Sequence, residues 1–529
     1  MQSDRHIVTS TCYITTPIYY VNDRPHIGHA YTSLAADVLA RWRRMQGRDV
    51  FFLTGTDEHG QKVEKAAQDA GEDPQAFTDR VSESFRELAT RMGFSHDDFI
   101  RTTEARHKRG CIALWERLVA NGQIYLGHYE GWYAVRDEAF YGSDELTERD
   151  GQKFAPSGAP VEWVREPSYF FRLSDWADKL LAFYEAHPDF IAPTTRRNEV
   201  LSFVRSGLQD LSISRTSFTW GVPVPGDPGH VMYVWLDALA NYITALGYPE
   251  TDGERWRFWP ADVHFVGKDI LRFHAIYWPA FLMAADLPPP RRVFAHGWWT
   301  NEGQKISKSV GNVIDPLALI DEFGLDALRY FLLREVPFGN DGDFSRSALI
   351  ARLNGELNDG LGNLAQRTLT LIQKNCEGRL PALPILKESD PSSVLAQEAS
   401  HADRIFMDEF IHGLPELVRS DIENQRFDLA LATVFTSVRE ANAYITRQQP
   451  WALRKTDLAR MAAVLRNLHS ALRVFATVLQ PFMPGTMATL LDQLGVPAES
   501  RDLAALGTPM AEGTALPAPS PIFAKAVVA

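Results

Sequence analysis

The chain has 529 residues, of which 45% are hydrophobic and 23% charged, and its formal net charge is −13. This balance is typical of a soluble globular protein with several domains, and it excludes a disordered, collagen-like or coiled-coil chain. The acidic total argues against indiscriminate binding to nucleic acids or anionic membranes, although a local basic surface could still bind RNA.

Three cysteines, Cys12, Cys111 and Cys376, lie far apart in the sequence and cannot supply a disulfide framework or a four-sulfur zinc site. The first residues contain Asp4 and no continuous apolar run, unlike a secretory signal. The apolar stretch at 278–285 is much shorter than the ~20 residues that a membrane-spanning helix needs. We therefore expect a reducing, cytoplasmic location and no membrane partner.

The first 121 residues alternate between predicted strands and helices. TCYITTP is β-branched and aromatic, which predicts a strand that ends at Pro17. Residues 26–47 place apolar side chains at helical spacing, and DVFFLTG is an apolar run of strand length. Strand, helix and strand in this order predict a right-handed βαβ unit with parallel strands.

The pattern changes after Gly122, where residues to about 229 are rich in Gly, Pro, Tyr and Trp and indicate an inserted domain. Alternation resumes with predicted strands in DVHFVGKD and RRVFAHGWW and a helix between them. From about residue 345 the pattern is helical almost throughout, which predicts a bundle. Its strongest stretches are 349–374, 394–419, 427–447 and 458–478, and the tail is rich in Pro and Ala.

The first motif, Pro25-His26-Ile27-Gly28-His29, follows a predicted strand and opens a predicted helix. A helix N-terminus offers free N–H groups and the positive end of the helix dipole, so it is a natural phosphate site. Gly28 would let a ligand approach the backbone, and His26 and His29 would add ring N–H donors. Alone, the motif fits a helix cap with incidental histidines equally well.

The second motif is Lys305-Ile306-Ser307-Lys308-Ser309. Two lysines three residues apart could neutralise a polyphosphate during displacement, although such a segment in isolation is more typical of a solvated loop. The two motifs together, in this order and on these elements, resemble the class I aminoacyl-tRNA synthetases.

The resemblance extends to the methionyl-tRNA synthetases through most of the chain. The segments that carry it are TTPIYYVNDRPHIGHAY, FLTGTDEHGQK, VEWVREPSYFFRLS, SFTWGVPVPGDPGHVMYVWLDAL, FVGKDILRFHAIYWPAFL and KISKSVGNVIDP. That family more usually has Met where this chain has Ile306. The resemblance implies a ligase that activates methionine with ATP to methionyl-adenylate and transfers it to the 3′ end of initiator and elongator tRNA(Met).

The same resemblance implies an α/β fold with a Rossmann-like parallel sheet, split by a connective domain and followed by an α-helical anticodon-binding bundle. The expected boundaries are 1–121 and 230–296 for the two catalytic halves, 122–229 for the insertion, 297–345 for the KISKS loop and stem-contact region, 346–506 for the bundle and 507–529 for the tail.

The resemblance assigns catalysis to His26, His29, Lys305 and Lys308, and ATP binding to these four with Gly28 and Asp269. The methionine pocket would hold the ammonium group on Asp57, and its polarizable thioether would pack against aromatic rings. On the residues alone, core packing would explain the tryptophans and a helix cap would explain Asp57. The implied pocket residues are Ile18, Tyr20, Asp57, Trp235, Ala238, Tyr242, Ile270, His274 and Trp278.

Asn363, Arg367 and Trp451 match the positions that read the anticodon in the family. An aromatic ring can stack on a splayed base while neighbouring polar side chains read the edge of that base. The alternative for Trp451 is a core tryptophan held by Pro450.

Many family members carry zinc-binding cysteines in the insertion, but residues 131–156 contain none. We therefore expect no zinc, Mg²⁺ only with the ATP, and a monomer. Asp137, Glu138 and Asp144 are more typical of a solvated face than of a metal site. A synthetase for another amino acid, a small-molecule nucleotidyltransferase and an inactive RNA-binding paralogue remain as alternatives.

Overall fold

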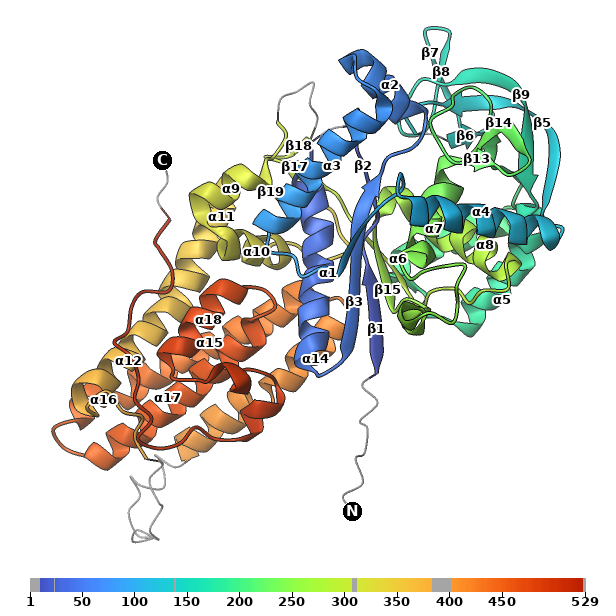
Figure 1. The fold of residues 1–529 in the computed structure, drawn as a ribbon. Coiled ribbons are helices and arrows are strands. Elements are labelled where there is room, and N and C mark those ends of the chain that lie inside the picture. The colour runs from blue at the N-terminus through green and yellow to red at the C-terminus, as the bar shows by residue number, and fades with distance from the viewer. Residues whose placement is uncertain (1–9, 23, 138, 307–311, 383–400, 527–529) are drawn as a thin grey trace, which may run out of the picture. The chain divides into compact units, whose positions relative to one another are not determined.

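The structure is a computed structural model that describes residues 10–22, 24–137, 139–306, 312–382 and 401–526. The chain forms two compact units (Figure 1). The first unit consists of residues 1–36 and 49–298, and the second consists of residues 37–48 and 299–529.

A parallel sheet is the centre of the first unit (Figure 1). The strands run in the order β10-β16-β15-β1-β3-β2, and β4 also pairs with β3. All of these pairs are parallel, as the alternating pattern predicts. The strands are β1 (Thr11–Thr15), β2 (Tyr19–Tyr20), β3 (Asp49–Asp57), β4 (Asp98–Arg101), β10 (Ile191–Ala192), β15 (Val263–Gly267) and β16 (Val293–His296).

The strand order has a consequence for ligand binding. From β1 the chain moves to β3 on one side of the sheet, and later to β15 on the other side of β1. The connections therefore diverge between β1 and β15, and the crevice beyond the carboxyl ends of strands at such a switch point is where open α/β sheets bind ligands.

The helices of the first unit connect these strands. Helix α3 begins at Pro74 because Asp73 caps it, accepting hydrogen bonds from the backbone N–H groups of Gln75 and Ala76. The helices are α1 (Ile27–Met45, whose last residues belong to the second unit), α2 (Gln61–Ala70), α3 (Pro74–Arg91), α4 (Ala105–Ala120), α5 (Ala177–Ala186), α6 (Thr194–Arg205), α7 (Val234–Thr244) and α8 (Trp278–Ala284).

The helix expected between β15 and β16 is not a single regular helix. It begins as a 3-10 turn at Lys268–Ile270, widens to a π-helix at Phe273–Tyr277 and continues as α8. Pro279 cannot donate a backbone hydrogen bond, and its ring would clash with the carbonyl four residues earlier in a regular α-helix. The widened turn directly before α8 accommodates this residue.

The inserted region is antiparallel, unlike the sheet that it interrupts. Its largest sheet pairs β5 with β9, flanked by β6 and β11. Ala134, Ala155, Ala159 and Val161 form a small core here. The strands are β5 (Ile124–Ala134), β6 (Ala139–Tyr141), β7 (Thr147–Arg149), β8 (Gln152–Phe154), β9 (Glu162–Phe171), β11 (Leu211–Ser212), β12 (Ser214–Arg215), β13 (Pro223–Val224) and β14 (Asp227–Met232).

The expectation that Asp137 belongs to a solvated face is wrong. Its carboxylate is half-buried and accepts hydrogen bonds from Tyr141 Oη at 3.0 Å and from Ser157 Oγ. Asp144 is exposed, as expected, and Glu138 lies outside the described residues. Asp137 thus links Tyr141 and Ser157 within the insertion through hydrogen bonds.

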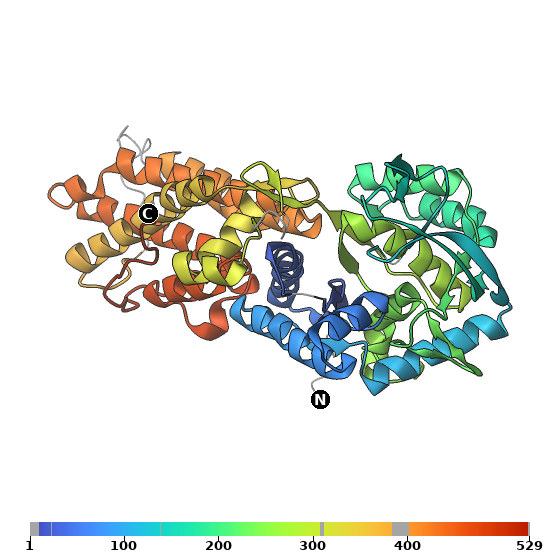
Figure 2. The same cartoon turned by 90° about the horizontal axis from the view of Figure 1, so that it is seen from above.

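The second unit is mainly helical, as predicted, and Figure 2 shows its C-terminal helices lying alongside one another. The expected helix at 349–374 is a continuous helical stretch with a π-helix, η5, between α11 and α12. Part of the predicted stretch 394–419 lies outside the described residues. The elements are β17 (Trp299–Asn301), β18 (Gln304–Lys305), α9 (Pro316–Phe323), α10 (Leu325–Arg334), β19 (Gly342–Phe344), α11 (Arg346–Arg352), η5 (Leu353–Gly362), α12 (Asn363–Asn375), η6 (Ile405–His412), α14 (Leu414–Glu423), α15 (Phe427–Gln448), α16 (Pro450–Leu453), α17 (Leu458–Leu479) and α18 (Pro484–Gln493).

The C-terminal segment packs on the helices of this same unit. Gln373 Nε2 donates to the carbonyl of Leu516 at 2.8 Å, and the amide of Asn354 exchanges two hydrogen bonds with the backbone of Ala526. The segment therefore has fixed partners although it forms no helix there.

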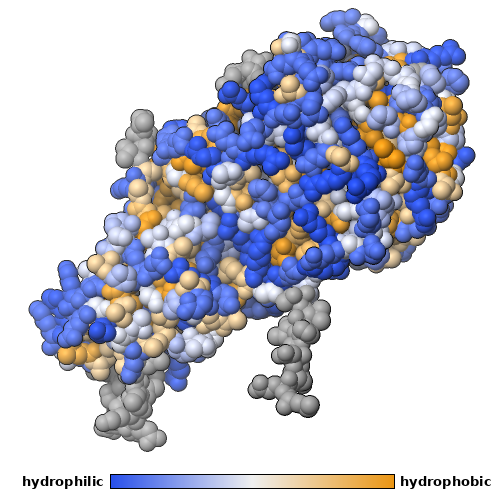
Figure 3. Space-filling model, viewed as in Figure 1, coloured by the Kyte–Doolittle hydropathy of each residue, from blue (hydrophilic) through white to orange (hydrophobic). Residues whose placement is uncertain are grey.

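Hydrophilic residues cover most of the face shown in Figure 3, in keeping with the acidic composition. Of the helices in the described ranges, none combines the length and the apolar character needed to cross a membrane.

Candidate functional site

The histidines of the first motif flank the beginning of α1. The backbone N–H of Gly28 donates to His26 Nδ1 at 3.1 Å, and that of His26 donates to His29 Nδ1 at 3.0 Å. Because both Nδ1 atoms accept hydrogen bonds, each neutral ring carries its proton on Nε2. The two ring centroids lie 4.0 Å apart. The site thus presents two neighbouring imidazoles, each with one remaining N–H donor.

Burial sets the charge of these rings. It lowers the pKa of His26, although Asp269 opposes the shift, and it lowers the pKa of His29 well below the ordinary value, with a further contribution from His26. At neutral pH both rings are therefore uncharged hydrogen-bond donors. A β-carbon at Gly28 would lie 3.0 Å from His26 Cε1, so a larger residue would crowd this ring.

Asp269 follows the carboxyl end of β15 and faces the same region. Its carboxylate accepts a hydrogen bond from Trp298 Nε1 at 3.1 Å and acts on the pKa values of both His26 and His296. A β-carbon at Gly267 would lie only 2.5 Å from Asp269 Oδ1. Asp269 and the histidines thus lie together at the switch point of the sheet.

The predicted methionine-binding residues all belong to the first unit, and each is buried or half-buried. Tyr242 Oη lies 2.7 Å from His274 Nε2, and His274 Nδ1 lies 3.0 Å from the carbonyl oxygen of Ile270. Nδ1 must therefore carry the proton, and Nε2 accepts from the tyrosine hydroxyl. Burial lowers the pKa of His274 to about 4, so this ring is neutral.

Further aromatic rings pack next to Tyr242 and His274. Trp235 stacks on Phe273 with a centroid distance of 3.7 Å, and Tyr20 meets Trp235 edge-on at 6.4 Å. Trp235 Nε1 is buried and has no hydrogen-bond partner in the described part of the chain. The structure thus brings the rings of three predicted residues, Tyr20, Trp235 and His274, into one apolar group with a free donor.

His264, which none of the sequence motifs singled out, lies beneath Tyr242. The two rings stack with centroids 4.0 Å apart, His264 Nδ1 lies 2.7 Å from Thr15 Oγ1, and Trp278 Nε1 donates to His264 Nε2 at 3.3 Å. Burial lowers the pKa of His264 well below the ordinary value. A histidine inside an otherwise apolar strand was the signal that could have identified this position.

The two lysines of the second motif are not placed at this site. Lys305 is the last residue of β18 in the second unit and is described by its backbone only. Lys308 lies in 307–311, outside the described residues. The expected convergence of lysines and histidines on one triphosphate therefore remains a prediction.

In the second unit the structure brings together two of the three predicted anticodon residues. The guanidinium of Arg367 lies over the ring of Trp451, 5.6 Å from its centroid. Trp451 is 39% exposed, whereas Pro450 is buried, so the alternative of a core tryptophan is wrong. Asn363 begins α12, and its amide lies 3.5 Å from Asp359 Oδ1.

Among the described residues, His107, Cys111 and Asp237 bring three potential metal ligands within 4.8 Å of one another. His107 Nε2 lies 2.6 Å from Asp237 Oδ1 and 3.1 Å from Cys111 Sγ. Two ligands of one tetrahedral zinc ion would be roughly 3.3 Å apart at metal–ligand distances of ~2.0–2.1 Å. We therefore interpret this buried group as directly hydrogen-bonded side chains.

Two protein-family models match the chain. The family described as tRNA synthetases class I (M) matches residues 12–369, and the anticodon binding domain of methionyl tRNA ligase matches residues 402–528.

Curated relatives match over almost the whole chain. The methionine--tRNA ligase of Rickettsia bellii is 56% identical over 508 residues, covering 93% of this chain and 94% of that protein. The methionine--tRNA ligase of Brucella suis is 55% identical over 519 residues, covering 98% of each.

Solved structures show the same likeness. Mycobacterium tuberculosis methionyl-tRNA synthetase in complex with methionyl-adenylate superposes with a TM-score of 0.91 at 49% identity, covering 97% of this chain and all of that one. The apo form of the same protein gives a TM-score of 0.85 at 46% identity, covering 98% and 99%.

Proposed function

The chain belongs to the methionine-specific class I aminoacyl-tRNA synthetases, and we propose which of its side chains carry each part of the methionine--tRNA ligase reaction. One observation supports the assignment most directly. The paired histidines at the start of α1, the carboxylate of Asp269 and the aromatic group around Trp235 belong to one unit. Asp269 follows β15 at the switch point, and its charge acts on the pKa of His26.

The aromatic group is suited to a thioether. Methionine sulfur is polarizable and packs favourably against rings, and the neutral imidazoles of His264 and His274 place no charge beside it. We assign the ammonium group of the amino acid to Asp57, whose carboxylate is buried at the end of β3. The pocket consists of Ile18, Tyr20, Asp57, Trp235, Ala238, Tyr242, Ile270, His274 and Trp278.

In the first step the methionine carboxylate attacks the α-phosphorus of ATP, and pyrophosphate leaves. The carboxylate is already ionised at neutral pH, so no general base is needed. The Nε2–H groups of His26 and His29 would donate to phosphate oxygens as charge develops, and Gly28 would leave room for the nucleotide. Lys305 and Lys308 would add positive charge, and Mg²⁺ would enter with the ATP as part of the substrate.

In the second step a ribose hydroxyl of the terminal adenosine of tRNA takes the methionyl group, and AMP leaves. Arg367 and Trp451 offer a stacking surface for an anticodon base, and Asn363 offers an amide for the base edge. The same bundle would serve initiator and elongator tRNA(Met), with the enzyme acting as a cytoplasmic monomer.

We also propose that the insertion folds without zinc. Ala134 and Ala155 contribute to its small core, and Asp137 links Tyr141 and Ser157 across it. Dialysis of the protein against a strong chelator, followed by removal of the chelator, should leave its melting temperature and its activity with added Mg²⁺ unchanged, and metal analysis should find much less than one zinc ion per chain.

The proposed function is tested by pyrophosphate exchange with each amino acid in turn, with and without tRNA. We expect exchange that depends on methionine and needs no tRNA, followed by charging of tRNA(Met) when tRNA is added. Exchange that depends on another amino acid, or none at all, would refute the assignment.

A further inference from the structure

The buried carboxylate of Asp237, in the first half of α7, links two other elements of the first unit. Its Oδ2 lies 2.7 Å from His59 Nδ1, and its Oδ1 lies 2.6 Å from His107 Nε2. Burial by itself raises the pKa of Asp237, but the two imidazoles outweigh burial and hold that pKa below its ordinary range. Asp237 is therefore an ionised acceptor, and both imidazoles donate to it.

The two partners of one of these bonds belong to segments that carry different residues of the proposed methionine pocket. His59 follows Asp57, the proposed ammonium ligand, by two residues, and Asp237 shares α7 with Trp235 and Tyr242. Both Asp57 and Asp237 raise the pKa of the Cys111 thiol, with Asp237 and burial contributing more, so both carboxylates lie near that sulfur. The His59–Asp237 bond thus joins the chain around the ammonium ligand to the helix that carries the rings.

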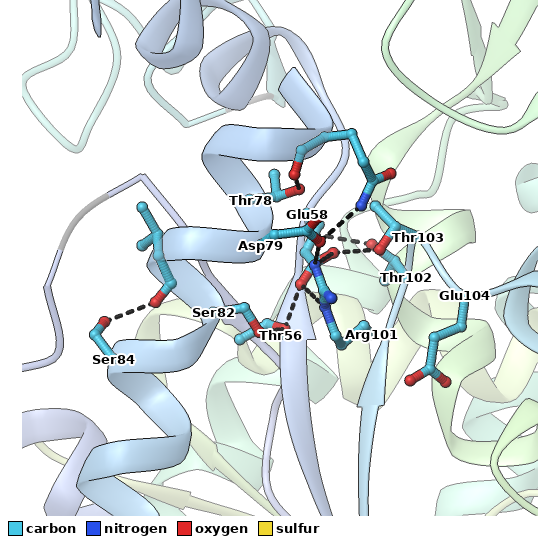
Figure 4. A network of polar contacts seen from close by, with 12 residues as sticks. Thr56, Glu58, Thr78, Asp79, Ser82, Ser84, Arg101, Thr102, Thr103 and Glu104 are labelled. Carbon is cyan, nitrogen blue, oxygen red and sulfur yellow. Dashed lines mark hydrogen bonds and ion pairs between the residues drawn. The ribbon is translucent and has the colours of Figure 1, made fainter. Parts of the chain in front are cut away.

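The turn that contains His59 is also held by hydrogen bonds to the residues at the end of β4. Between Asp57 and His59, the carboxylate of Glu58 accepts a two-pronged interaction from Arg101 at 2.7 and 3.0 Å and a further bond from Thr103 (Figure 4). Its backbone N–H donates to Thr102 Oγ1 at 2.9 Å. These bonds fix the turn to the end of β4, and His59 fixes it to α7.

We propose that Asp237 is a positioning residue which, through His59, sets the distance between the ammonium ligand and the thioether-binding rings and so selects amino acids by length. This inference rests on the proposed function. The pocket binds the amino acid by its ammonium group and by the end of its side chain. It can discriminate between side chains of different length only if these two binding positions cannot move apart. His107 binds the same carboxylate from α4 but is not part of the turn. It therefore stabilises Asp237 without affecting the distance between the ammonium ligand and the rings.

The test compares kcat/KM in pyrophosphate exchange for methionine, for ethionine, which is longer by one methylene, and for norleucine, which has the same length without sulfur. His59→Ala should lower the methionine-to-ethionine ratio about tenfold, within the range that one methylene is worth in a fitted pocket. The methionine-to-norleucine ratio should stay at the wild-type value, because the length is unchanged.

Two variants separate positioning from general destabilisation. His59→Asn places an amide N–H close to the position of Nδ1 and should restore the wild-type ratio. His107→Ala removes the other imidazole from the same carboxylate, so it should lower the melting temperature while leaving the ratio unchanged. If His59→Ala does not fold, His59→Gln, whose donor lies one bond farther out, displaces the turn and should change the ratio instead.

The proposal is overturned if a folded His59→Ala or His59→Gln variant keeps the wild-type ratio, or if His107→Ala changes the ratio as much as His59→Ala does. A failure of the proposed function is distinct from both results, because the wild-type protein would then show no exchange with methionine.

Discussion

Replacing Tyr242 by Phe removes a single oxygen from the proposed methionine pocket. That oxygen donates to His274 Nε2 at 2.7 Å, while the ring that carries it stacks on His264 at 4.0 Å. The stacking should survive the substitution, but His274 Nε2 is left as a buried acceptor without its donor. Leaving such a group unsatisfied costs about 1–3 kcal/mol, so we expect the free energy of unfolding to fall by this amount.

Methionine binding should weaken because His274 loses the bond that orients its ring. A loss of about 1.4 kcal/mol corresponds to a tenfold increase in methionine KM. The KM for ATP and kcat should change little, because the contact of His274 with the bound methionine is the same in the ground state and in the transition state. Pyrophosphate exchange at varied methionine and at varied ATP measures these constants.

Tyr444→Phe is the matched control. Tyr444 is a fully buried tyrosine of α15 in the second unit, and its hydroxyl donates to Asp403 Oδ1 at 2.6 Å. Its loss should destabilise the protein to a similar degree without raising the methionine KM. If Tyr242→Phe is destabilised but keeps the wild-type methionine KM, our placement of the pocket is refuted.

Three further predictions concern other parts of the chain. Lys308→Ala should lower kcat in pyrophosphate exchange far more than it raises methionine KM, and equal effects would contradict a transition-state role. Trp451→Ala should abolish most tRNA charging but preserve exchange, whereas Leu458→Ala, which alters another exposed apolar residue of the unit, should preserve both. Burial lowers the pKa values of His274 and His469 from 6.5 to about 4, so the unfolded chain binds protons first as the pH falls. As the pH falls from 6.5 to 4, each of these two histidines should reduce the free energy of unfolding by about 3 kcal/mol. A free energy of unfolding, measured with urea, that does not change over this pH range would contradict this prediction.

Much of the fold could be predicted because its determinants are local. The apolar strands, the helical spacing after His29 and the periodicity of the C-terminal third each act within a few residues, and the structure confirms the parallel sheet and the helical region. The π-helical turn before Trp278 could not be predicted, because Pro279 signals an irregularity without specifying its form.

The polar groups of the pocket were harder to find because their partners are distant in the sequence. His264 contacts Thr15 across 249 positions, and His107 contacts Asp237 across 130. Both His264 and Asp237 lie in segments that are otherwise apolar, where periodicity indicates burial but not a hydrogen-bond partner. The pocket aromatics were identified through a family resemblance, since burial alone would have indicated ordinary core packing.

The widened turn at Phe273–Tyr277 also has an evolutionary consequence. A π-turn is an α-helix with one surplus residue, so loss of a single codon there would yield a straighter helix without shifting the flanking segments. That deletion would set the Pro279 ring against the carbonyl of the preceding turn, and it would also withdraw the His274 ring from Tyr242. A one-residue gap at this point in a homologue should therefore be accompanied by loss of the proline and by a change in amino-acid specificity.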